Sequence, residues 1–304
     1  MLSTISLALA GVIALQGSAA DVRLPDTDLT VHERPSDRLV VSTYYQFKKT
    51  AQAYLRASGR NSFTKKPDHW RVAVSPDGKR AMAARSLVDA KGCPTFDLIT
   101  RRTGATRRIP VSGLCGKLAG GYFSWSPNNQ KVVQLAFTVK GGTTGYLTVD
   151  AASGRTRYVA MPKSYKNSRF IWTPDAKQIV AYDNKSIRFL SPDGKLKRTL
   201  TGKGSLAGEE HTFSPSGDRF LTVCPGGGIC IWSVKTGEAV GTVHTGSYGV
   251  YGWWDSSHLI IGRASGKKYE IVQVDMAGEV TRVLVNGSVS TFTKNRLDLD
   301  FTKR

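Results

Sequence analysis

Acidic residues are scarce in this chain. Asp and Glu together number 23, against 43 Lys and Arg, so the formal net charge at pH 7 is +20. The electrostatic field of such a net charge attracts polyanions, and salt screens it. The charge therefore predicts either a polyanionic partner or a generally soluble basic surface.

The motifs of common catalytic sites are also missing. No G-x-S-x-G occurs, which excludes a recognisable α/β-hydrolase. The five histidines are scattered one to a segment, without HExxH or a pair at i and i+4, so they predict turn or surface positions. No glycine-rich loop runs into a helical pattern, which excludes a phosphate loop of that type. We expect no catalytic residues, no metal site and no cofactor.

Long apolar runs are absent after the first twenty residues. Residues 1–20 carry no charged side chain, and the stretch from Ile5 to Leu15 has the length of a signal-peptide core, followed by small residues at 18–20. This predicts a signal peptide or a retained membrane anchor, with the rest of the chain outside the cytoplasm. The alternative is a buried N-terminal strand or helix of a cytosolic protein.

Cysteine is limited to four residues, Cys93, Cys115, Cys224 and Cys230. Their spacing is not that of a zinc site, which needs closely spaced pairs of ligands. An even number of cysteines in an exported chain favours disulfides.

A repeated turn is the most prominent feature that the chain does have. A Ser or Thr followed by Pro and turn residues recurs in "SPDGKR" (75–80), "SPNNQK" (126–131), "TPDAKQ" (173–178) and "SPSGDR" (214–219). A second series of turn glycines alternates with it, at Gly104, Gly154, Gly194, Gly237 and Gly278. Each unit of ~45 residues therefore holds an A–B hairpin and a C–D hairpin. Four strands in a repeat of this length predict a propeller blade.

The number of blades follows from the degenerate copies. "GWWDSSHLIIG" (252–262) is a fifth copy without its proline, and residues 290–301 predict a sixth A–B hairpin with no C–D hairpin after it. The missing outer strands can come from residues 38–45 and 51–56, which closes a ring of six blades. Seven blades are the alternative and need an unrecognised repeat in residues 38–70. We expect an all-β, single β-propeller over 38–304, preceded by a linker or extended arm at 21–37.

Residues 211–246, "HTFSPSGDRFLTVCPGGGICIWSVKTGEAVGTVHTG", carry a family resemblance. Their Ser-Pro turn, "IW" strand end and "TGE" turn are similar to a WD repeat, and the SPDG copies resemble TolB-like β-propellers. Trp232–Ser233 replaces the Trp–Asp of the WD family, which implies that its buried Asp–His network is absent. The resemblance implies the fold and leaves the function open, because propellers include enzymes, scaffolds and receptors.

The hairpin register predicts how the cysteines pair. Cys93 and Cys115 are equally far from the turn at Gly104, so they should face each other across antiparallel strands. Cys224 and Cys230 flank a short B–C connection whose ends lie within disulfide reach. Four free buried cysteines are the alternative, and they become the favoured one if the protein is cytosolic.

The blade topology also predicts on which face of the propeller the charged side chains of each loop or turn lie. B–C and D–A loops share one face, and A–B and C–D turns share the other. The first face is rich in glycine and lysine, which suits close approach to phosphate or carboxylate. We expect binding there to depend more on lysines than on Arg101, Arg102 and Arg107 of the opposite face. The candidate binding residues are Lys91, Lys117, Lys140, Lys163, Lys166, Lys203, Lys267 and Lys268.

These observations predict a non-enzymatic, monomeric binding module outside the cytoplasm. Its expected partner is a protein, an anionic cell-envelope polymer or an anionic lipid surface. Nucleic acid fits the charge but not the compartment. The alternatives are a propeller enzyme of the lactonase or quinoprotein type, which needs clustered acidic or metal-binding residues at the axis, and a cytosolic WD-repeat-like scaffold.

Overall fold

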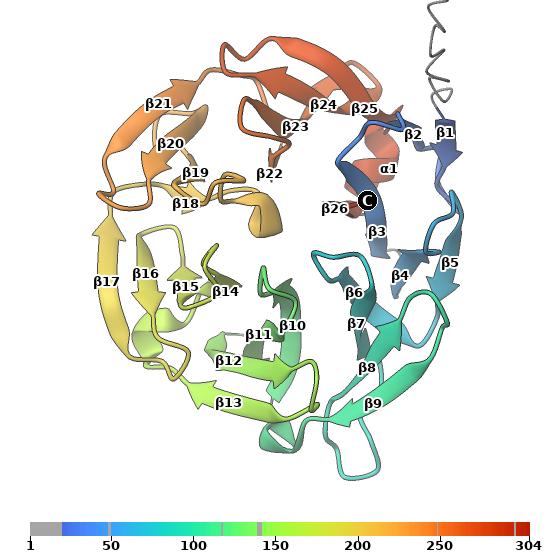
Figure 1. Ribbon diagram of the computed structural model, residues 1–304, viewed down its shortest axis with the longest axis vertical. Helices are drawn as coiled ribbons and strands as arrows, with labels where there is room; N and C mark the ends of the chain where they lie inside the picture. The colour runs from blue at the N-terminus through green and yellow to red at the C-terminus, as the bar shows by residue number, and fades with distance from the viewer. Residues whose placement is uncertain (1–19, 48–49, 117, 139–141, 248, 295) are drawn as a thin grey trace, which may run out of the picture.

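Six four-stranded antiparallel blades surround a central axis (Figure 1). The structure is a computed structural model that describes residues 20–47, 50–116, 118–138, 142–247, 249–294 and 296–304. The prediction of an all-β, six-bladed propeller is confirmed, and the seven-bladed alternative is wrong. The proposed signal peptide or anchor falls on residues 1–19, outside the described residues.

Blades 2 to 5 are continuous in sequence, with one strand following another from the axis outward. Blade 2 comprises β6 (His69–Val74), β7 (Arg80–Arg85), β8 (Thr95–Thr100) and β9 (Thr106–Pro110). Blade 3 comprises β10 (Leu118–Trp125), β11 (Lys131–Thr138), β12 (Thr143–Asp150) and β13 (Thr156–Ala160). Blade 4 comprises β14 (Arg169–Trp172), β15 (Ile179–Tyr182), β16 (Ser186–Leu190) and β17 (Leu196–Thr201). Blade 5 comprises β18 (Ser205–Leu206), β19 (Arg219–Val223), β20 (Ile229–Ser233) and β21 (Ala239–Val243). Short 3-10 turns precede the inner strands of blades 3 and 4, η1 (Ser112–Leu114) and η2 (Lys163–Tyr165), and a third, η3 (Glu209–His211), follows the inner strand β18 of blade 5.

The repeated Ser/Thr-Pro motif makes the first turn of blades 2 to 5. In blade 2 the Ser75 hydroxyl donates to the Asp77 carboxylate at 2.6 Å and accepts from the Arg80 backbone N–H at 3.0 Å. Thr173 makes the same pair of bonds in blade 4, and Ser126 makes an equivalent pair in blade 3, where the acceptor is the Asn128 amide oxygen. One buried hydroxyl therefore satisfies the backbone where two strands meet, which explains why the motif recurs with the blade.

Blade 6 is extended by the start of the described chain. It comprises β22 (Gly249–Trp253), β23 (His258–Ser265), β24 (Lys268–Asp275) and β25 (Val280–Ser288). A hairpin of β1 (Ala20–Arg23) and β2 (Thr30–Glu33) pairs with β25 at the outer edge. Residues 21–37, expected as a linker or extended arm, thus add two strands to this sheet instead, because Leu24 and Leu29 are buried against it.

Blade 1 closes the ring with strands from both ends of the chain. Its order is β26 (Asp298–Lys303), β3 (Leu39–Phe47), β4 (Ala51–Arg56) and β5 (Phe63–Lys66). The predicted C-terminal hairpin over 290–301 is wrong, because Val289–Lys294 form helix α1 and only one strand follows. Phe292 of α1 stacks on Tyr269 with ring centroids 3.7 Å apart, which favours the helix there. Three strands, rather than two, therefore come from the N-terminal side.

The hydrophobic core lies between neighbouring blades. A separate buried cluster fills each junction around the ring, from blades 6 and 1 through blades 5 and 6. Trp125, Trp172, Trp232 and Trp253 are all buried in these clusters. Among the residues that the structure describes, no helix has the length and apolar character needed to cross a membrane.

Both predicted disulfides are present. Cys93 is bonded to Cys115 and Cys224 to Cys230, with Cα separations of 3.9 and 5.2 Å. The bonds tie loops on the face that carries B–C and D–A connections, which we call the loop face. We call the side of the A–B and C–D turns the turn face.

Candidate functional site

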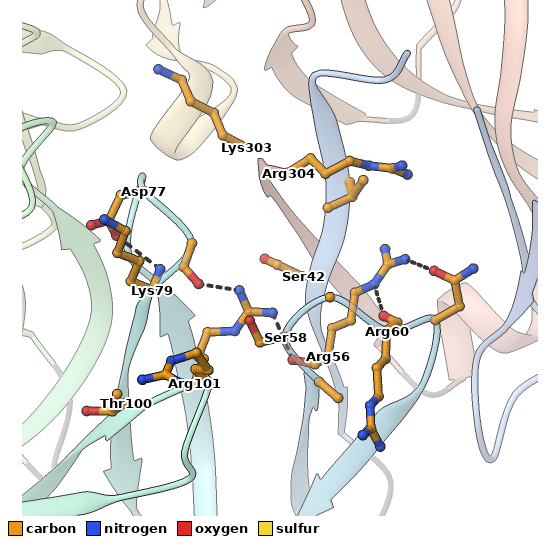
Figure 2. Close-up of a pocket in the computed structure, with 16 residues that line it drawn as sticks. Ser42, Arg56, Ser58, Arg60, Asp77, Lys79, Thr100, Arg101, Lys303 and Arg304 are labelled. Atoms are coloured by element: carbon orange, nitrogen blue, oxygen red, sulfur yellow. Dashed lines mark hydrogen bonds between the residues drawn. The ribbon is translucent and has the colours of Figure 1, made fainter. Parts of the chain in front are cut away.

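A basic cavity opens on the turn face between blades 1 and 2 (Figure 2). Its volume is about 540 Å³. Segments far apart in sequence line it: the β4–β5 turn, the β6–β7 turn, the β8–β9 turn and the C-terminal end. Its charged lining has one acid, Asp77, and seven cations: Arg56, Arg60, Lys79, Arg101, Arg102, Lys303 and Arg304.

Arg101 forms part of the floor and joins the two blades. Its guanidinium donates to the Gly78 carbonyl at 2.6 Å, in blade 2, and to the Arg56 carbonyl at 2.8 Å, in blade 1. Its Nε is buried without a hydrogen-bond partner. Burial, and then the nearby Arg56 charge, lowers the pKa of Arg101, although a guanidinium stays protonated in water at neutral pH. The floor is therefore positively charged and would gain from a nearby anion.

Arg56 is the second floor residue, and its charge is partly neutralised. Its guanidinium makes a two-pronged ion pair with Glu33, in which Nη2 lies 2.8 Å from Oε2. Arg304 donates to the same Oε2 at 3.1 Å. Glu33 is 4% exposed and belongs to the β2 strand, so a buried carboxylate holds both ends of the described chain at this cavity. The Arg56–Glu33 ion pair therefore fixes the geometry of the cavity, whereas it adds little net positive charge to it.

The rim carries the cations that are available to a ligand. Arg60, Lys79, Arg102 and Lys303 are exposed, and within the described part of the chain none has a carboxylate oxygen within 4.0 Å. The Asp77 carboxylate accepts from the Ser75 hydroxyl and the Lys79 backbone N–H, so its own turn engages it. The arrangement can bind an anion of several charges, with guanidinium forks suited to phosphate or carboxylate.

Sequence reasoning placed the candidate site on the loop face instead. The predicted lysines lie there, on the β7–β8 loop (Lys91), on and after η2 (Lys163, Lys166), before β18 (Lys203) and at the β23–β24 connection (Lys267, Lys268). They belong to different blades and line none of the described cavities. Lys203 lies 4.2 Å from the Trp232 ring centroid, a cation–π contact. Lys117 and Lys140 lie outside the described residues, and the binding role of the set stays a prediction.

The signals for the basic cavity are weak in sequence. "RR" at 101–102 and "KR" at 303–304 are short basic pairs, and Arg56 and Arg60 flank a turn. No local sequence pattern predicts that these basic residues lie close together in the fold. Only the closure of blade 1 by both chain ends brings these segments together.

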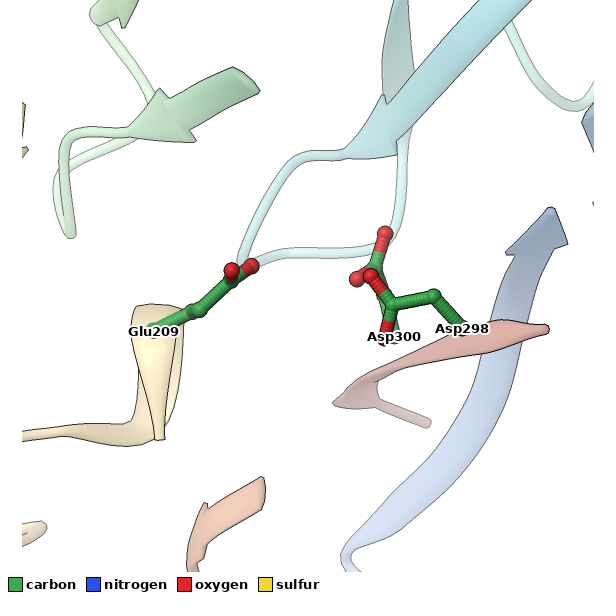
Figure 3. Close-up of side chains that lie close together, drawn as sticks. All are labelled: Glu209, Asp298 and Asp300. Atoms are coloured by element: carbon green, nitrogen blue, oxygen red, sulfur yellow. The ribbon is translucent and has the colours of Figure 1, made fainter. Parts of the chain in front are cut away.

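A second charged group lies at the axis (Figure 3). Glu209 of η3 extends toward Asp298 and Asp300 of β26, and their carboxylate oxygens lie within 4.8 Å of one another. Arg71 of β6, only 2% exposed, lies among them at 3.6 Å from Glu209 and 3.4 Å from each aspartate. Its guanidinium supplies the positive charge that a metal ion would otherwise supply. Tyr45 and Tyr122 sandwich it, with ring centroids 3.9 and 4.4 Å away.

Backbone geometry brings η3 to the axis. Gly208 has φ +89°, and a Cβ there would lie 2.5 Å from the Gly252 Cα, so η3 reaches β22 only because both residues lack side chains. Burial, and then the Asp298 charge, raises the pKa of Glu209 to about 7, and burial also raises that of Asp298. The axial group is thus an ion network that joins blades 1, 2 and 5.

Comparisons with known proteins agree with this architecture. No family model matches the chain. It is 35% identical over 124 residues to WD repeat-containing protein 1 of Bos taurus, covering 39% of this chain and only about 19% of that relative. TolB from Acinetobacter baumannii matches with a TM-score of 0.53 and 14% identity, over 90% of this chain and 67% of that one. Oligogalacturonate lyase from Vibrio parahaemolyticus matches with a TM-score of 0.59 and 12% identity, over 92% and 88%. The chain is a β-propeller that is similar in fold to TolB and to oligogalacturonate lyase and, over part of its length, similar in sequence to a WD repeat-containing protein.

Proposed function

We propose that the protein is a non-enzymatic binding module that holds an anionic partner in the basic cavity of the turn face. The observation that carries this proposal is the set of seven cations and one acid around a cavity of about 540 Å³. The net charge of +20 steers anions toward the molecule from a distance. The cavity then selects where they bind, because hydrogen bonds hold its floor arginines in place and its exposed rim cations have no carboxylate partner among the described residues.

The place of action in this proposal is outside the cytoplasm. Two disulfides support it, because such bonds persist in oxidising compartments and are rare in the cytosol. An anionic polymer or lipid of the cell envelope and an acidic protein are the partners that fit such a location. The uncharged N-terminal stretch is consistent with export.

Titration calorimetry against a polyanion at low salt tests the function. Replacing Arg60 and Arg102 with Ala should weaken binding at least tenfold, because both side chains are exposed rim cations. The matched control replaces Arg155 and Lys235, which are also exposed on turns of the same face but in blades 3 and 5. A third variant replaces Lys163 and Lys166 on the loop face. Equal losses in all three variants would mean diffuse attraction and no site, and a loss confined to the third would favour the loop face.

A second function is favoured by one observation at the axis. Glu209 has a pKa near 7 and lines a cavity of about 230 Å³ with Tyr251 and Tyr269, which suits general acid or base catalysis. One neighbour in fold is by name a lyase of oligogalacturonate. Incubation with oligogalacturonate and chromatography of the products would test this. Chain cleavage that is lost in Glu209→Gln would make the protein an enzyme, whereas intact substrate supports the binding module.

A further inference from the structure

The rim cations of the basic cavity belong to both of the blades that border it. Lys79 and Arg102 extend from turns of blade 2, whereas Arg60 and Lys303 belong to blade 1. Figure 2 shows Lys79 and Arg60 on opposite sides of the opening, with Ser42 between them. A ligand that contacts Arg60 and Lys79 together must therefore span this opening.

We propose that the ligand of this cavity carries several phosphate or carboxylate groups in a row and bridges blades 1 and 2 beside the ring closure. This inference rests on the proposed anion-binding function and specifies its ligand class. Each end of the ligand contacts the exposed cations of one blade, and its middle lies over Arg101. Binding therefore links the first strands of the chain to its last strand.

The floor residues explain why one anionic group is not enough. The guanidinium of Arg101 is held by two backbone carbonyls and that of Arg56 by Glu33, Asn61 and the Arg60 carbonyl. Neither can turn to surround a single phosphate. The rim side chains are exposed but lie on two sides, so a ligand gains their full attraction only with charges at both ends.

The site also lies where the ring is closed without covalent continuity. β26 pairs with β3, and the C-terminal residue completes this contact through Arg304 N–H to the Arg38 carbonyl at 3.1 Å. Lys303 and Arg304 end that strand at the cavity, beside Arg56 and Arg60 of blade 1 and Lys79 of blade 2. A ligand that binds only the closed ring stabilises the closure by mass action.

A series of probes of rising charge tests the ligand class. Calorimetry is carried out on the full chain with phosphate, pyrophosphate and tripolyphosphate, and in parallel with galacturonate, digalacturonate and trigalacturonate. We expect affinity to rise at least tenfold from the first to the third member of one series, and the stronger series identifies phosphate or carboxylate as the source. Equal affinities per molecule within both series would overturn the inference while leaving anion binding intact. No binding by any probe, with polyanion binding unaffected by the Arg60 and Arg102 changes, would overturn the proposed function as well.

One-sided variants test the bridge. Lys79→Ala with Arg102→Ala removes the blade 2 side, and Arg60→Ala with Lys303→Ala removes the blade 1 side. Each of these two double variants should bind tripolyphosphate about as weakly as phosphate. The control, Arg155→Ala with Lys235→Ala, should leave the ratio of the tripolyphosphate affinity to the phosphate affinity unchanged. Hydrogen exchange of the β26 amides should slow at least threefold with tripolyphosphate in the native chain and in the control, but not in the two one-sided variants. Full loss from one pair with no effect of the other, or unchanged exchange in the native chain, would refute bridging.

Discussion

At the scale of single residues, the cationic side chains fall into two groups. Some hold the fold together through hydrogen bonds, and others are exposed and available to a ligand. Arg198 donates to turn carbonyls of the neighbouring blade, and Arg101 donates to the Gly78 carbonyl of its own blade and to the Arg56 carbonyl of blade 1, so their charge is used inside the structure. Arg60 and Lys79 have no such partner among the described residues and lie at the opening of a cavity. The net charge alone does not distinguish these roles. Binding proposals therefore rest on exposed cations that the fold leaves unpaired.

Glu209 gives a prediction at this scale. Its pKa is about 7 in the folded protein because of burial and the Asp298 charge, against 4.5 for an ordinary glutamate. The folded state therefore binds the proton more tightly than the unfolded state, so this stabilisation is complete below about pH 4.5 and is lost as the pH rises through 7. Glu209→Gln should flatten the dependence of Tm on pH between 5 and 8. The change should be a few degrees at most, since the side chain is 39% exposed and solvent screens it.

Thermal unfolding followed by circular dichroism measures this effect. The control is Glu238→Gln, at an exposed glutamate of the β20–β21 turn, which should leave the pH profile of the native chain unchanged. Parallel Tm curves for the native chain and Glu209→Gln would contradict the assignment of the raised pKa to this residue.

At the scale of elements, the sequence predicts structures that neighbouring residues form by themselves. It does not predict elements that depend on contacts with distant segments. The Ser/Thr-Pro turns are predictable because one hydroxyl, a proline and a few turn residues form the whole structure. The cysteine pairing is predictable because each pair flanks one hairpin or one short connection, although the β8–β9 register, which pairs Thr95 with Pro110, does not set Cys93 directly opposite Cys115. Helix α1 is not, since it depends on Phe292 meeting a tyrosine of blade 6. The β1–β2 hairpin also depends on a partner, the free edge of β25.

The candidate site is missed for the same physical reason. Its cations come from three turns and from the last residues of the chain, more than two hundred residues apart, and each is unremarkable in its own segment. The blade topology alone tells which connections lie on the loop face and which on the turn face, which is why the lysines of the loop face could be predicted as a set. It does not tell which turns converge on one cavity, because that depends on how blade 1 is closed.

The two disulfides give a prediction at the scale of elements. Cys93–Cys115 spans a sequence separation of 22 and Cys224–Cys230 one of 6, so the longer loop restricts the unfolded chain more. Replacing Cys93 and Cys115 with Ser should lower the free energy of unfolding by about 3 kcal/mol, and replacing Cys224 and Cys230 by about 2 kcal/mol. Urea unfolding of the two double variants under identical conditions measures the difference. The reverse order, or four alkylatable thiols in the native protein, would contradict the assignment.

At the scale of the whole molecule, non-covalent pairing of the two ends of the described chain closes the ring. Blades 2 to 5 are each built from four consecutive strands, whereas the β1–β2 hairpin pairs with β25 of blade 6 and blade 1 joins β26 to strands that begin more than two hundred residues earlier. The buried cluster between blades 6 and 1 includes residues of β26, of α1 and of the β1–β2 hairpin. Loss of packing in this cluster should therefore open the ring rather than merely loosen a blade.

Phe301 tests this dependence on closure. It is 4% exposed on β26 and contacts Tyr251 of blade 6 edge-to-face, with ring centroids 6.0 Å apart. Phe301→Ala should cost about 3–5 kcal/mol of stability, as Phe→Ala does in packed cores. Phe220→Ala in blade 5, where the side chain is 1% exposed, should cost a similar amount and serves as the matched control. Only Phe301→Ala should accelerate hydrogen exchange of β26 and β3 ahead of global unfolding, because only that blade can detach a strand without breaking a hairpin. Uniform exchange throughout the ring in both variants would mean that closure is no weaker than the other blade junctions.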